Sequence, residues 1–405
     1  MKRSSKKTPG FCTARLQRIG SLMQGYVDRG DLAGMIATVA RQGKTVYREK
    51  FGWADKEARK PMQDDTIFAI ASMTKPITAV ALMTLYEEGH FYLNTPVSKF
   101  IPAFKNVKVC AGVAENGSLI LTDIDRPVTF RHLFTHTSGL SYGWNPSDPV
   151  DREYQKAQKT LEEAKRSLTL AELADGLSRM PLAFQPGTKW RYSTSIDVLG
   201  RLAEIISGMP FDQFLAERIF KPLGMTDTAF FVSPEKMARV ATIYGHPKAG
   251  KDCQPLTHIR PPSALPKFVM PGGGLFSTVA DYARFCQMLV NGGELDGTRV
   301  LSPKTVELFS LNHAPEDALP YNFGKDDPYH HGYGYSLGTR VLMDVSKSGV
   351  YGSVGEFGWD GAYSTYFWID PQEQLYGLLM VQHSPNGFYP LHPEFKQLTY
   401  QAMEY

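Results

Sequence analysis

The chain has 405 residues, of which 42% are hydrophobic and 21% charged, the composition of an ordinary globular protein that can form one large domain or two. Its formal net charge is +3, but four of the 44 basic residues lie in the first seven positions, so the rest of the chain carries about one negative charge. A body without excess positive charge argues against a nucleic-acid-binding surface.

The N-terminal stretch 1–13 is basic and lacks an apolar core segment, so it predicts a flexible tail rather than a signal peptide. No apolar run reaches about 18 residues, which predicts no membrane-spanning helix and no membrane partner. The four cysteines are far apart and form no C-x-x-C pair, as in proteins of a reducing compartment. We therefore expect a cytoplasmic protein.

Hydrophobic periodicity predicts strands near both ends of the chain and helices between them. Helices are expected at 14–29, 71–88, 129–134, 150–180, 196–207, 211–219 and 280–291, hairpins at 35–52 and 105–127, and strands at 333–344, 362–369 and 375–382. The fold class that follows is α+β, with an antiparallel sheet made from N- and C-terminal segments, flanked by helices and interrupted by a mainly helical insertion. Residues 14–405 then form a single unit, with an α/β region at about 14–70 and 285–405 and a helical region at about 71–284.

The pattern Ser-x-x-Lys at the start of the long apolar helix is the first candidate for chemistry. Positions i and i+3 share a helix face, so the Lys75 ammonium can reach the Ser72 hydroxyl directly. The helix is apolar nearly all round, and a charge buried there needs a partner or a function. The alternative is an N-cap serine with a lysine that reaches water. Two further copies, Ser4-Lys7 and Ser233-Lys236, lie in polar sequence that favours solvated surface.

Two other familiar arrangements are present only in part. The sequence pattern of a nucleophile elbow, G-x-S-x-G, occurs at Gly334-Tyr335-Ser336-Leu337-Gly338. A nucleophile elbow needs a strand, a sharp turn and then a helix. The surrounding sequence alternates like one continuous strand, so we interpret this motif as structural. No H-E-x-x-H occurs, and His330-His331 has no partner at metal-ligand spacing, so no metal or other cofactor is expected.

Three motifs in order carry a family resemblance: Ser72-Met73-Thr74-Lys75, Tyr192-Ser193-Thr194 and Trp359-Asp360-Gly361. With them the chain resembles the serine β-lactamase and penicillin-binding-protein superfamily, and it is most similar to the family VIII carboxylesterases, relatives of class C β-lactamases. The resemblance covers roughly residues 14–400 and implies a β-lactamase/transpeptidase-like fold.

The resemblance also implies roles for individual residues. Ser72 would be the acylated nucleophile, and Lys75 would hold it together with Tyr192 in one hydrogen-bonded unit. Tyr192 would act as general base and then as general acid, which requires nearby cations because the pKa of an unperturbed tyrosine is about 10. The backbone N–H groups of Ser72 and Ala362 would form the oxyanion hole.

Two positions depart from the penicillin-recognising pattern. Trp359 stands where β-lactamases have the lysine of Lys-Thr-Gly, and Thr194 stands where they have asparagine. A literal Lys347-Ser348-Gly349 exists upstream, but no strong strand follows it. The missing cation favours neutral esters over penicillins. Contacts with the substrate are expected from Trp359, Asp360 and Gly361.

Two aromatic side chains, Tyr142 and Trp144, are expected to line the acyl pocket, and segments 145–180, 232–270 and 313–331 are expected to shape it. The function that this set implies is a serine carboxylesterase acting on a small-molecule, short-chain acyl ester, with weak cephalosporin hydrolysis as a side activity. Acyl transfer or amide or peptide hydrolysis on the same scaffold, and a penicillin-binding sensor without turnover, stay open. The sequence leaves the oligomeric state open as well.

Overall fold

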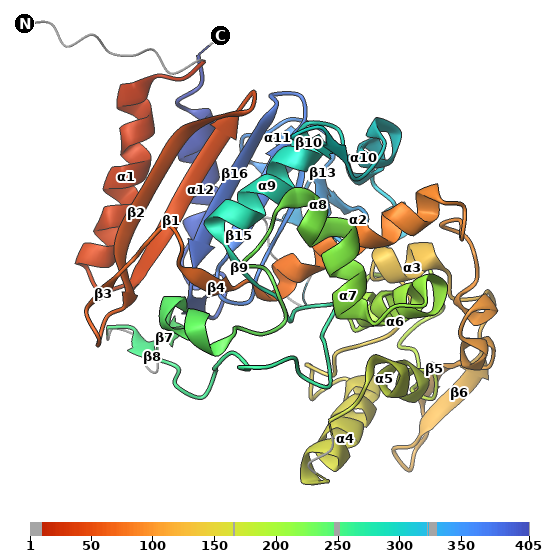
Figure 1. Cartoon of the computed structure of the whole chain (residues 1–405). Coiled ribbons are helices and arrows are strands. Elements are labelled where there is room, and N and C mark those ends of the chain that lie inside the picture. The colour runs from red at the N-terminus through yellow and green to blue at the C-terminus, as the bar shows by residue number, and fades with distance from the viewer. Residues whose placement is uncertain (1–9, 165–166, 247–251, 322, 324–329, 405) are drawn as a thin grey trace, which may run out of the picture.

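An eight-stranded antiparallel sheet built from both ends of the chain organises the fold (Figure 1). The computed structural model describes residues 10–164, 167–246, 252–321, 323 and 330–404. In spatial order the strands are β12 (Tyr333–Tyr335), β13 (Arg340–Leu342), β14 (Phe357–Asp360), β15 (Tyr366–Asp370), β16 (Leu375–Val381), β1 (Gly34–Arg41), β2 (Lys44–Asp55) and β3 (Lys60–Pro61). The N-terminal hairpin therefore pairs with the last long strand, which confirms the predicted α+β class.

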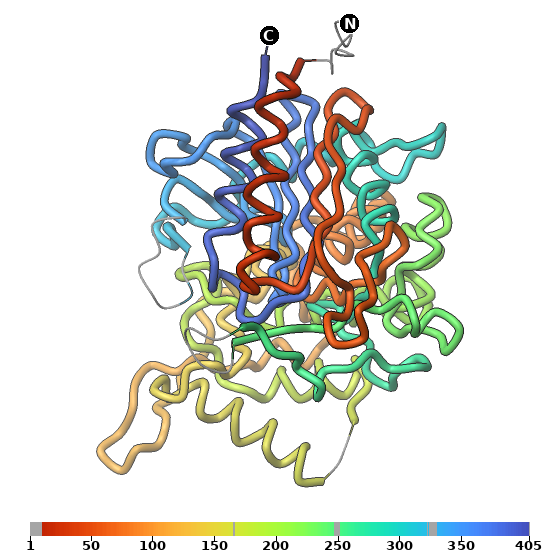
Figure 2. Tube along the Cα trace, turned by 90° about the vertical axis from the view of Figure 1, so that its left-hand side faces the viewer, coloured from red at the N-terminus to blue at the C-terminus, as the bar shows by residue number. Residues whose placement is uncertain are grey.

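Both faces of the sheet are covered, which explains why β1 is apolar at nearly every position. Met35, Ala37 and Val39 pack on one face against α1 (Thr13–Asp28) and α12 (Leu391–Tyr400). The side chains between them point to the opposite face, because successive residues of a strand alternate. Figure 2 shows α1 and α12 side by side on the outer face, where the Cys12 N–H donates to the Ala402 carbonyl at 2.8 Å.

Two helices lie on the inner side of the sheet. α9 (Val279–Val290) contacts β15 and β16, and α2 (Thr74–Glu87) is buried at every position from Thr74 to Leu85. A helix that is apolar all round belongs inside a protein, as the sequence predicts for this segment. The predicted boundary between regions at 284 and 285 falls inside α9, so this helix belongs with the sheet.

The inserted region is mainly helical and lies beside the sheet (Figure 1). Its helices α3, α5 and α7 contact α6, which also packs on α2. Their bounds are α3 (Phe130–Phe134), α4 (Pro149–Glu163), α5 (Leu170–Leu177), α6 (Ser195–Ser207), α7 (Phe211–Leu215) and α8 (Lys221–Leu223). The predicted surface hairpin is β5 (Lys108–Val113) with β6 (Leu119–Asp123). α6 ends at Gly208, whose φ of 71° is the left-handed conformation that glycine adopts readily.

Short elements complete the described chain. They are β4 (Ile67–Ala69), β7 (Tyr244–Gly245), β8 (Gln254–Pro255), β9 (Phe276–Thr278), β10 (Glu294–Leu295), β11 (Thr298–Arg299), α10 (Pro303–Phe309), α11 (Val345–Ser348) and β17 (His383–Ser384). Among the residues described, no helix is long and apolar enough to cross a bilayer.

Four local expectations need correction. The expected helix 150–180 is two separate helices, α4 and α5, and the expected strand 362–369 begins only at Tyr366, in β15. The predicted strand 333–344 is a hairpin, because Ser336 N–H bonds to the Thr339 carbonyl and Gly338 turns the chain at a φ of 71°. The predicted tail 1–13 lies partly outside the described residues, and its end is not free. Phe11 is 3% exposed and bridges to Met403, so ordered packing begins before residue 14.

Candidate active site

Ser72 lies in a 3₁₀ turn, Ala71–Met73, between strand β4 and helix α2. β4 is held by antiparallel pairing with β9, so the turn is anchored before the helix begins. Ala71 has a φ of 43°, a left-handed conformation that is uncommon for residues other than glycine. Such backbone strain clusters at functional sites, where the surrounding structure maintains it. The turn leaves Ser72 partly accessible while its neighbours on both sides are buried.

Lys75 is 1% exposed, and its ammonium reaches Ser72. Its Nζ donates to Ser72 Oγ at 3.3 Å and to the Gly272 carbonyl at 2.5 Å. The ammonium also lies 4.4 Å from the centre of the Tyr192 ring, a cation–π distance. The predicted Ser-x-x-Lys pair is thus in direct contact, and Lys75 has partners that compensate for its burial.

Tyr192 comes just before α6, and the third motif reaches it from the sheet. The Trp359 indole Nε1–H donates to Tyr192 Oη at 3.2 Å, and Trp359 itself is 2% exposed on β14. The structure therefore brings Ser72, Lys75, Tyr192 and Trp359 together from three distant segments. Trp359 is hydrogen-bonded to the phenol and is too buried to form an open pocket wall.

Burial sets the pKa values of the two proton-carrying side chains. It lowers the pKa of Lys75 to about 7, although the negative charges of Asp197 and Asp360 oppose this change. It raises the pKa of Tyr192 above its ordinary value, against the hydrogen bonds from Ser72 and Trp359. At neutral pH, Lys75 can therefore supply a neutral amine, while Tyr192 keeps its proton. These directions favour Lys75 over Tyr192 as the group that accepts the serine proton.

The loop after β14 lies against the turn that carries Ser72. A Cβ placed on Gly361 would overlap the Ile70 carbonyl and Thr365 Oγ1, so only glycine allows this approach. Thr365 Oγ1 also donates to the Ile70 carbonyl at 3.3 Å. Ile70 precedes Ser72 by two residues, and Ala362 follows Gly361. This packing brings the segment with the Ala362 N–H beside the turn that carries Ser72.

Asp197 is a site residue that the motifs did not single out. It lies on α6, is 2% exposed, and accepts the Gly272 N–H at 2.9 Å. The Gly272 carbonyl in turn accepts a hydrogen bond from Lys75 Nζ, so Gly272 links the Asp197 carboxylate to the Lys75 amine. Burial raises the pKa of Asp197 to about 6, and the charge of Lys75 opposes that rise. The signal in the sequence was an aspartate among the apolar positions Ile196, Val198 and Leu199 of a predicted helix.

The predicted aromatic residues lie on the Tyr192 side of the site. Tyr142 and Trp144 stack with ring centres 4.7 Å apart, and both rings lie within 5.7 Å of the Tyr192 ring. Trp144 is 64% exposed, so the stacked pair offers an aromatic surface to solvent next to the Tyr192 phenol.

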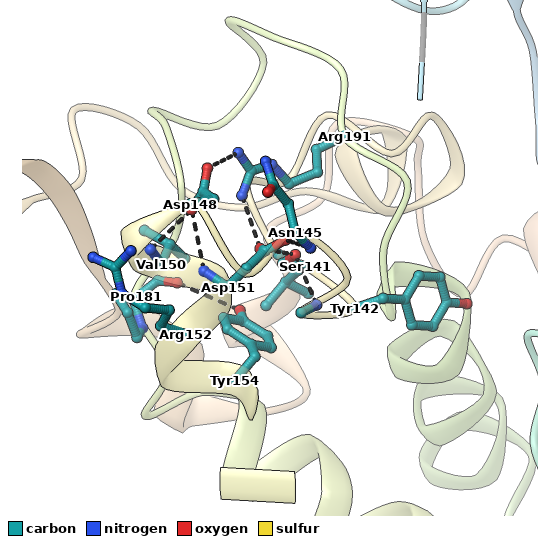
Figure 3. Close-up of polar contacts among 12 residues, drawn as sticks. Ser141, Tyr142, Asn145, Asp148, Val150, Asp151, Arg152, Tyr154, Pro181 and Arg191 are labelled. Atoms are coloured by element: carbon teal, nitrogen blue, oxygen red, sulfur yellow. Dashed lines mark hydrogen bonds and ion pairs between the residues drawn. The ribbon is translucent and has the colours of Figure 1, made fainter. Parts of the chain in front are cut away.

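An ion-pair cluster holds the loop that carries these two rings (Figure 3). Arg191, the residue before Tyr192, bonds to Asp148 at 2.6 Å and to Asp151 at 3.0 Å. Ser141 donates to the same Asp151 carboxylate. Figure 3 shows Tyr142 directed away from this cluster. Arg191 therefore couples the position of the loop to the position of the next residue, Tyr192.

Asp360 lies apart from the other predicted contact residues. Strand alternation turns its side chain to the sheet face opposite Trp359, where Arg340 Nη1 lies 3.1 Å from Oδ2 and Asn386 Nδ2 donates to Oδ1 at 2.7 Å. It reaches the site only through its charge, which acts on Lys75. The carboxylate is therefore engaged within the protein.

Alternative sites from the sequence find little support in the geometry. Ser336 is fully buried in the β12–β13 hairpin and donates to the Leu308 carbonyl at 3.1 Å. Lys347 lies on the short helix α11 with a side chain 73% exposed and a 3.7 Å ion pair to Asp344. Across the described part of the chain, no group of three or more His, Cys, Asp or Glu side chains could hold a metal ion.

Comparison with known proteins places this arrangement in a family. The Beta-lactamase family matches the chain over residues 19–401. The chain therefore belongs to the beta-lactamase family. Among curated members of similar sequence, Protein Rv1367c of Mycobacterium tuberculosis (strain ATCC 25618 / H37Rv) is 37% identical over 370 residues, covering 89% of this chain and 88% of that protein.

A second relative indicates which members of the beta-lactamase family the chain resembles. Esterase EstB of Burkholderia gladioli is 30% identical over 376 residues, covering 88% of this chain and 87% of that protein. The solved structure of EstCE1, described as a hydrolase with promiscuous acyltransferase activity, has a TM-score of 0.77 at 24% identity and covers 96% of this chain and 98% of its own. The predicted resemblance to family VIII carboxylesterases is confirmed, and the family supports serine hydrolase or acyl-transfer chemistry.

Proposed function

We propose that the protein hydrolyses uncharged carboxylic esters through an acyl-enzyme on Ser72. The observation that carries this proposal is the contact between Trp359 and Tyr192 beside the Ser72–Lys75 pair. In the penicillin-recognising pattern a lysine occupies the Trp359 position. An indole there positions the phenol and offers no positive charge to a substrate carboxylate.

Acylation follows from the geometry of the two proton carriers. Lys75 Nζ takes the proton of Ser72 Oγ, 3.3 Å away, as the oxygen attacks the ester carbonyl. The N–H groups of Ser72 and Ala362 stabilise the negative charge on the carbonyl oxygen, and each such donor contributes about 10²–10³ in turnover. Tyr192 gives its proton to the departing alcohol and regains one from Lys75. Water then repeats these steps on the acyl-enzyme and releases the acid.

The charges around the site set the proposed substrate class. A β-lactam carboxylate finds no ammonium at Trp359, because the indole there is uncharged and donates to Tyr192. Neutral esters avoid this penalty, since an unpaired charge loses solvation without compensation. Short-chain acyl esters are substrates in this account, and cephalosporin hydrolysis is a weak side activity. A small molecule of this kind is the expected partner, and the four free cysteines agree with the proposed cytoplasmic location.

Acyl transfer to an alcohol is a second candidate, favoured by the exposed aromatic pair beside Tyr192. An apolar acceptor stacked on Trp144 would approach the acyl-enzyme from the side where Tyr192 handles protons. Such an acceptor competes with water for the same intermediate. The promiscuous acyltransferase activity named for EstCE1 supports this candidate.

The deciding experiment measures hydrolysis of p-nitrophenyl acetate, butyrate and a chromogenic cephalosporin by the wild type and by Ser72→Ala. Ser336→Ala is the matched control, since Ser336 is the serine of the G-x-S-x-G pattern. Ser72→Ala should lose ester hydrolysis to background and Ser336→Ala should retain it, with esters far better than the cephalosporin. Retained activity in Ser72→Ala contradicts the proposal, and one stoichiometric burst without turnover favours a penicillin-binding sensor. Added alcohols that yield new esters identify acyl transfer.

A further inference from the structure

A large cavity lies on the side of the nucleophile turn away from the tyrosine. Its volume is about 920 Å³, near the upper end of ordinary ligand pockets. It is lined by residues of the paired strands β4 and β9, of the loop after β2, and of the segments 230–243 and 255–276. Its walls are mainly apolar and include Phe230, Met237, Ile243, Leu256, Phe268 and Phe276.

The cavity lies near both predicted oxyanion N–H groups, although neither Ser72 nor Ala362 lines it. Gly273 lines it, and a Cβ on this glycine would lie 3.8 Å from the carbonyl carbon of Ala71, the residue before Ser72. Tyr363, the residue after Ala362, also lines it. The cavity therefore comes within about one residue of each predicted oxyanion donor, and an acyl chain that leaves the site on this side can enter it.

The leaving-group side is separate from this cavity. Tyr192, which would protonate the departing alcohol, does not line it, and neither do Trp144 or Trp359. The two halves of an ester diverge from the carbonyl carbon, so an alcohol directed toward Tyr192 leaves the opposite side to the acyl chain. Tyr142 and Trp144 then face the alcohol, whereas the sequence assigned them to the acyl pocket.

Charged residues also line the cavity, namely Asp55, Glu57, Lys60 and Arg260, and its two carboxylates have partners within the protein. Thr242 Oγ1 donates to Asp55 at 2.7 Å, and Tyr244 Oη donates to Glu57 at 2.5 Å. Because these carboxylates are already bonded, they do not require a polar ligand. The apolar part of the wall suits carbon chains, because removal of apolar surface from water is the main source of their affinity.

We infer that this cavity is the acyl-binding site and that the enzyme accepts long or bulky apolar acyl groups in addition to short ones. The inference rests on the proposed ester hydrolysis at Ser72 and names the substrate class of that site. Burial of each additional methylene is expected to raise kcat/KM about fourfold until the chain fills the space or reaches solvent. The ratio of kcat/KM for p-nitrophenyl octanoate to that for the acetate should then exceed about tenfold.

The chain offers a matched pair of leucines for the test. Leu256 lines the cavity, and Leu265 lies in the same segment, is 47% exposed and does not line it. Leu256→Trp should fill part of the cavity and lower the octanoate-to-acetate ratio at least about tenfold. Leu265→Trp should leave the ratio within about twofold of wild type. Ala241→Phe narrows the same cavity from a different wall and should act like Leu256→Trp, which guards against a single variant that fails to fold.

Each outcome decides between the claims. If kcat/KM in the wild type does not change with acyl-chain length, or if the two tryptophan variants have equal effects, the cavity is not the acyl-binding site. Ser72-dependent hydrolysis of the acetate in that case still supports the proposed function. Loss of the long-chain preference in both cavity variants supports the assignment. Absence of Ser72-dependent hydrolysis for every ester overturns the proposed function itself.

Discussion

Replacing Asp197 with asparagine should move the acid limb of the pH–rate profile to lower pH. In the wild type, the pKa of Lys75 is about 7 because burial disfavours the ammonium, and the Asp197 carboxylate limits that decrease. The side-chain amide in Asp197→Asn would keep an oxygen for the Gly272 N–H, which Asp197 now accepts at 2.9 Å, but would lose the charge. The ammonium form of Lys75 is therefore destabilised while the hydrogen-bonded geometry is kept.

The size of the shift follows from the buried charge pair. An opposite charge at close range changes a pKa by about one to three units, or about 1.4–4 kcal/mol. In this account kcat/KM rises as Lys75 loses its proton. A lower pKa of Lys75 therefore moves the acid limb of the profile to lower pH, to about pH 4–6. In the wild type, the limb belongs to the coupled Lys75–Asp197 pair, and in the variant it reports Lys75 alone.

The assay is kcat/KM for p-nitrophenyl acetate between pH 4 and 9, because kcat/KM reports the ionisations of the free enzyme. Asp281→Asn is the control: Asp281 is also a buried acid, 5% exposed, but it bonds to Thr228 and is not among the charges acting on Lys75. Its acid limb should match the wild type. An unmoved limb in Asp197→Asn, or a shift confined to the alkaline limb, refutes Lys75 as the base and favours the Tyr192 phenolate.

Three further results are expected. Tyr192→Phe should lower kcat/KM by about 10²–10⁴. The loss should be larger for an ethyl ester than for a p-nitrophenyl ester, because the p-nitrophenolate leaving group needs little protonation. Equal losses for the two esters would argue against Tyr192 as a general acid. Trp359→Phe removes one hydrogen bond to the phenol and should cost about 2- to 12-fold in kcat/KM; no change would mean that the bond does not position Tyr192. Glu356→Gln leaves the 2%-exposed Lys396 without its 2.5 Å anionic partner and should lower the free energy of unfolding in urea by about 3–5 kcal/mol. The exposed control Glu307→Gln should stay within about 1 kcal/mol of wild type, and a similar loss in both would refute the burial argument.

Local sequence signals predicted the elements well where one periodicity dominates. The α2 segment is apolar on every face, and its burial needed no knowledge of the fold to anticipate. The hairpin of β1 and β2 likewise follows from two β-rich runs around a glycine turn. Its pairing with β16 was expected only as the simplest way to close a sheet, because strand partners distant in sequence leave no local signal.

The sequence predicted most of the individual site residues, but the contacts between residues of distant segments could be seen only in the structure. Ser72 and Lys75 share a helix start, so spacing alone brings them together. Trp359 was expected as a substrate contact, and only the tertiary arrangement makes its indole a donor to Tyr192. Asp197 escaped notice because one acid in an apolar helix has no motif, and its importance comes from Gly272 on a different segment.

Burial and turns account for the local misreadings. Phe11 belongs to a basic stretch, yet its ring fills a site between α1 and the C-terminal segment, which composition does not reveal. The hairpin around Gly338 resembles one strand in sequence because its two short arms continue the same alternation. Asp360 was grouped with its neighbours by motif, whereas strand alternation directs it to the other face of the sheet.

The most direct test of the central claim is to identify the residue that an ester-like phosphorylating reagent modifies. Diethyl p-nitrophenyl phosphate transfers its phosphoryl group to an activated serine and releases p-nitrophenol, and the adduct resists hydrolysis. Peptide mapping by mass spectrometry should find one diethylphosphate per chain, on Ser72, with loss of esterase activity in proportion to labelling. A label on Ser336 or on another side chain, or full labelling with esterase activity retained, would contradict the account.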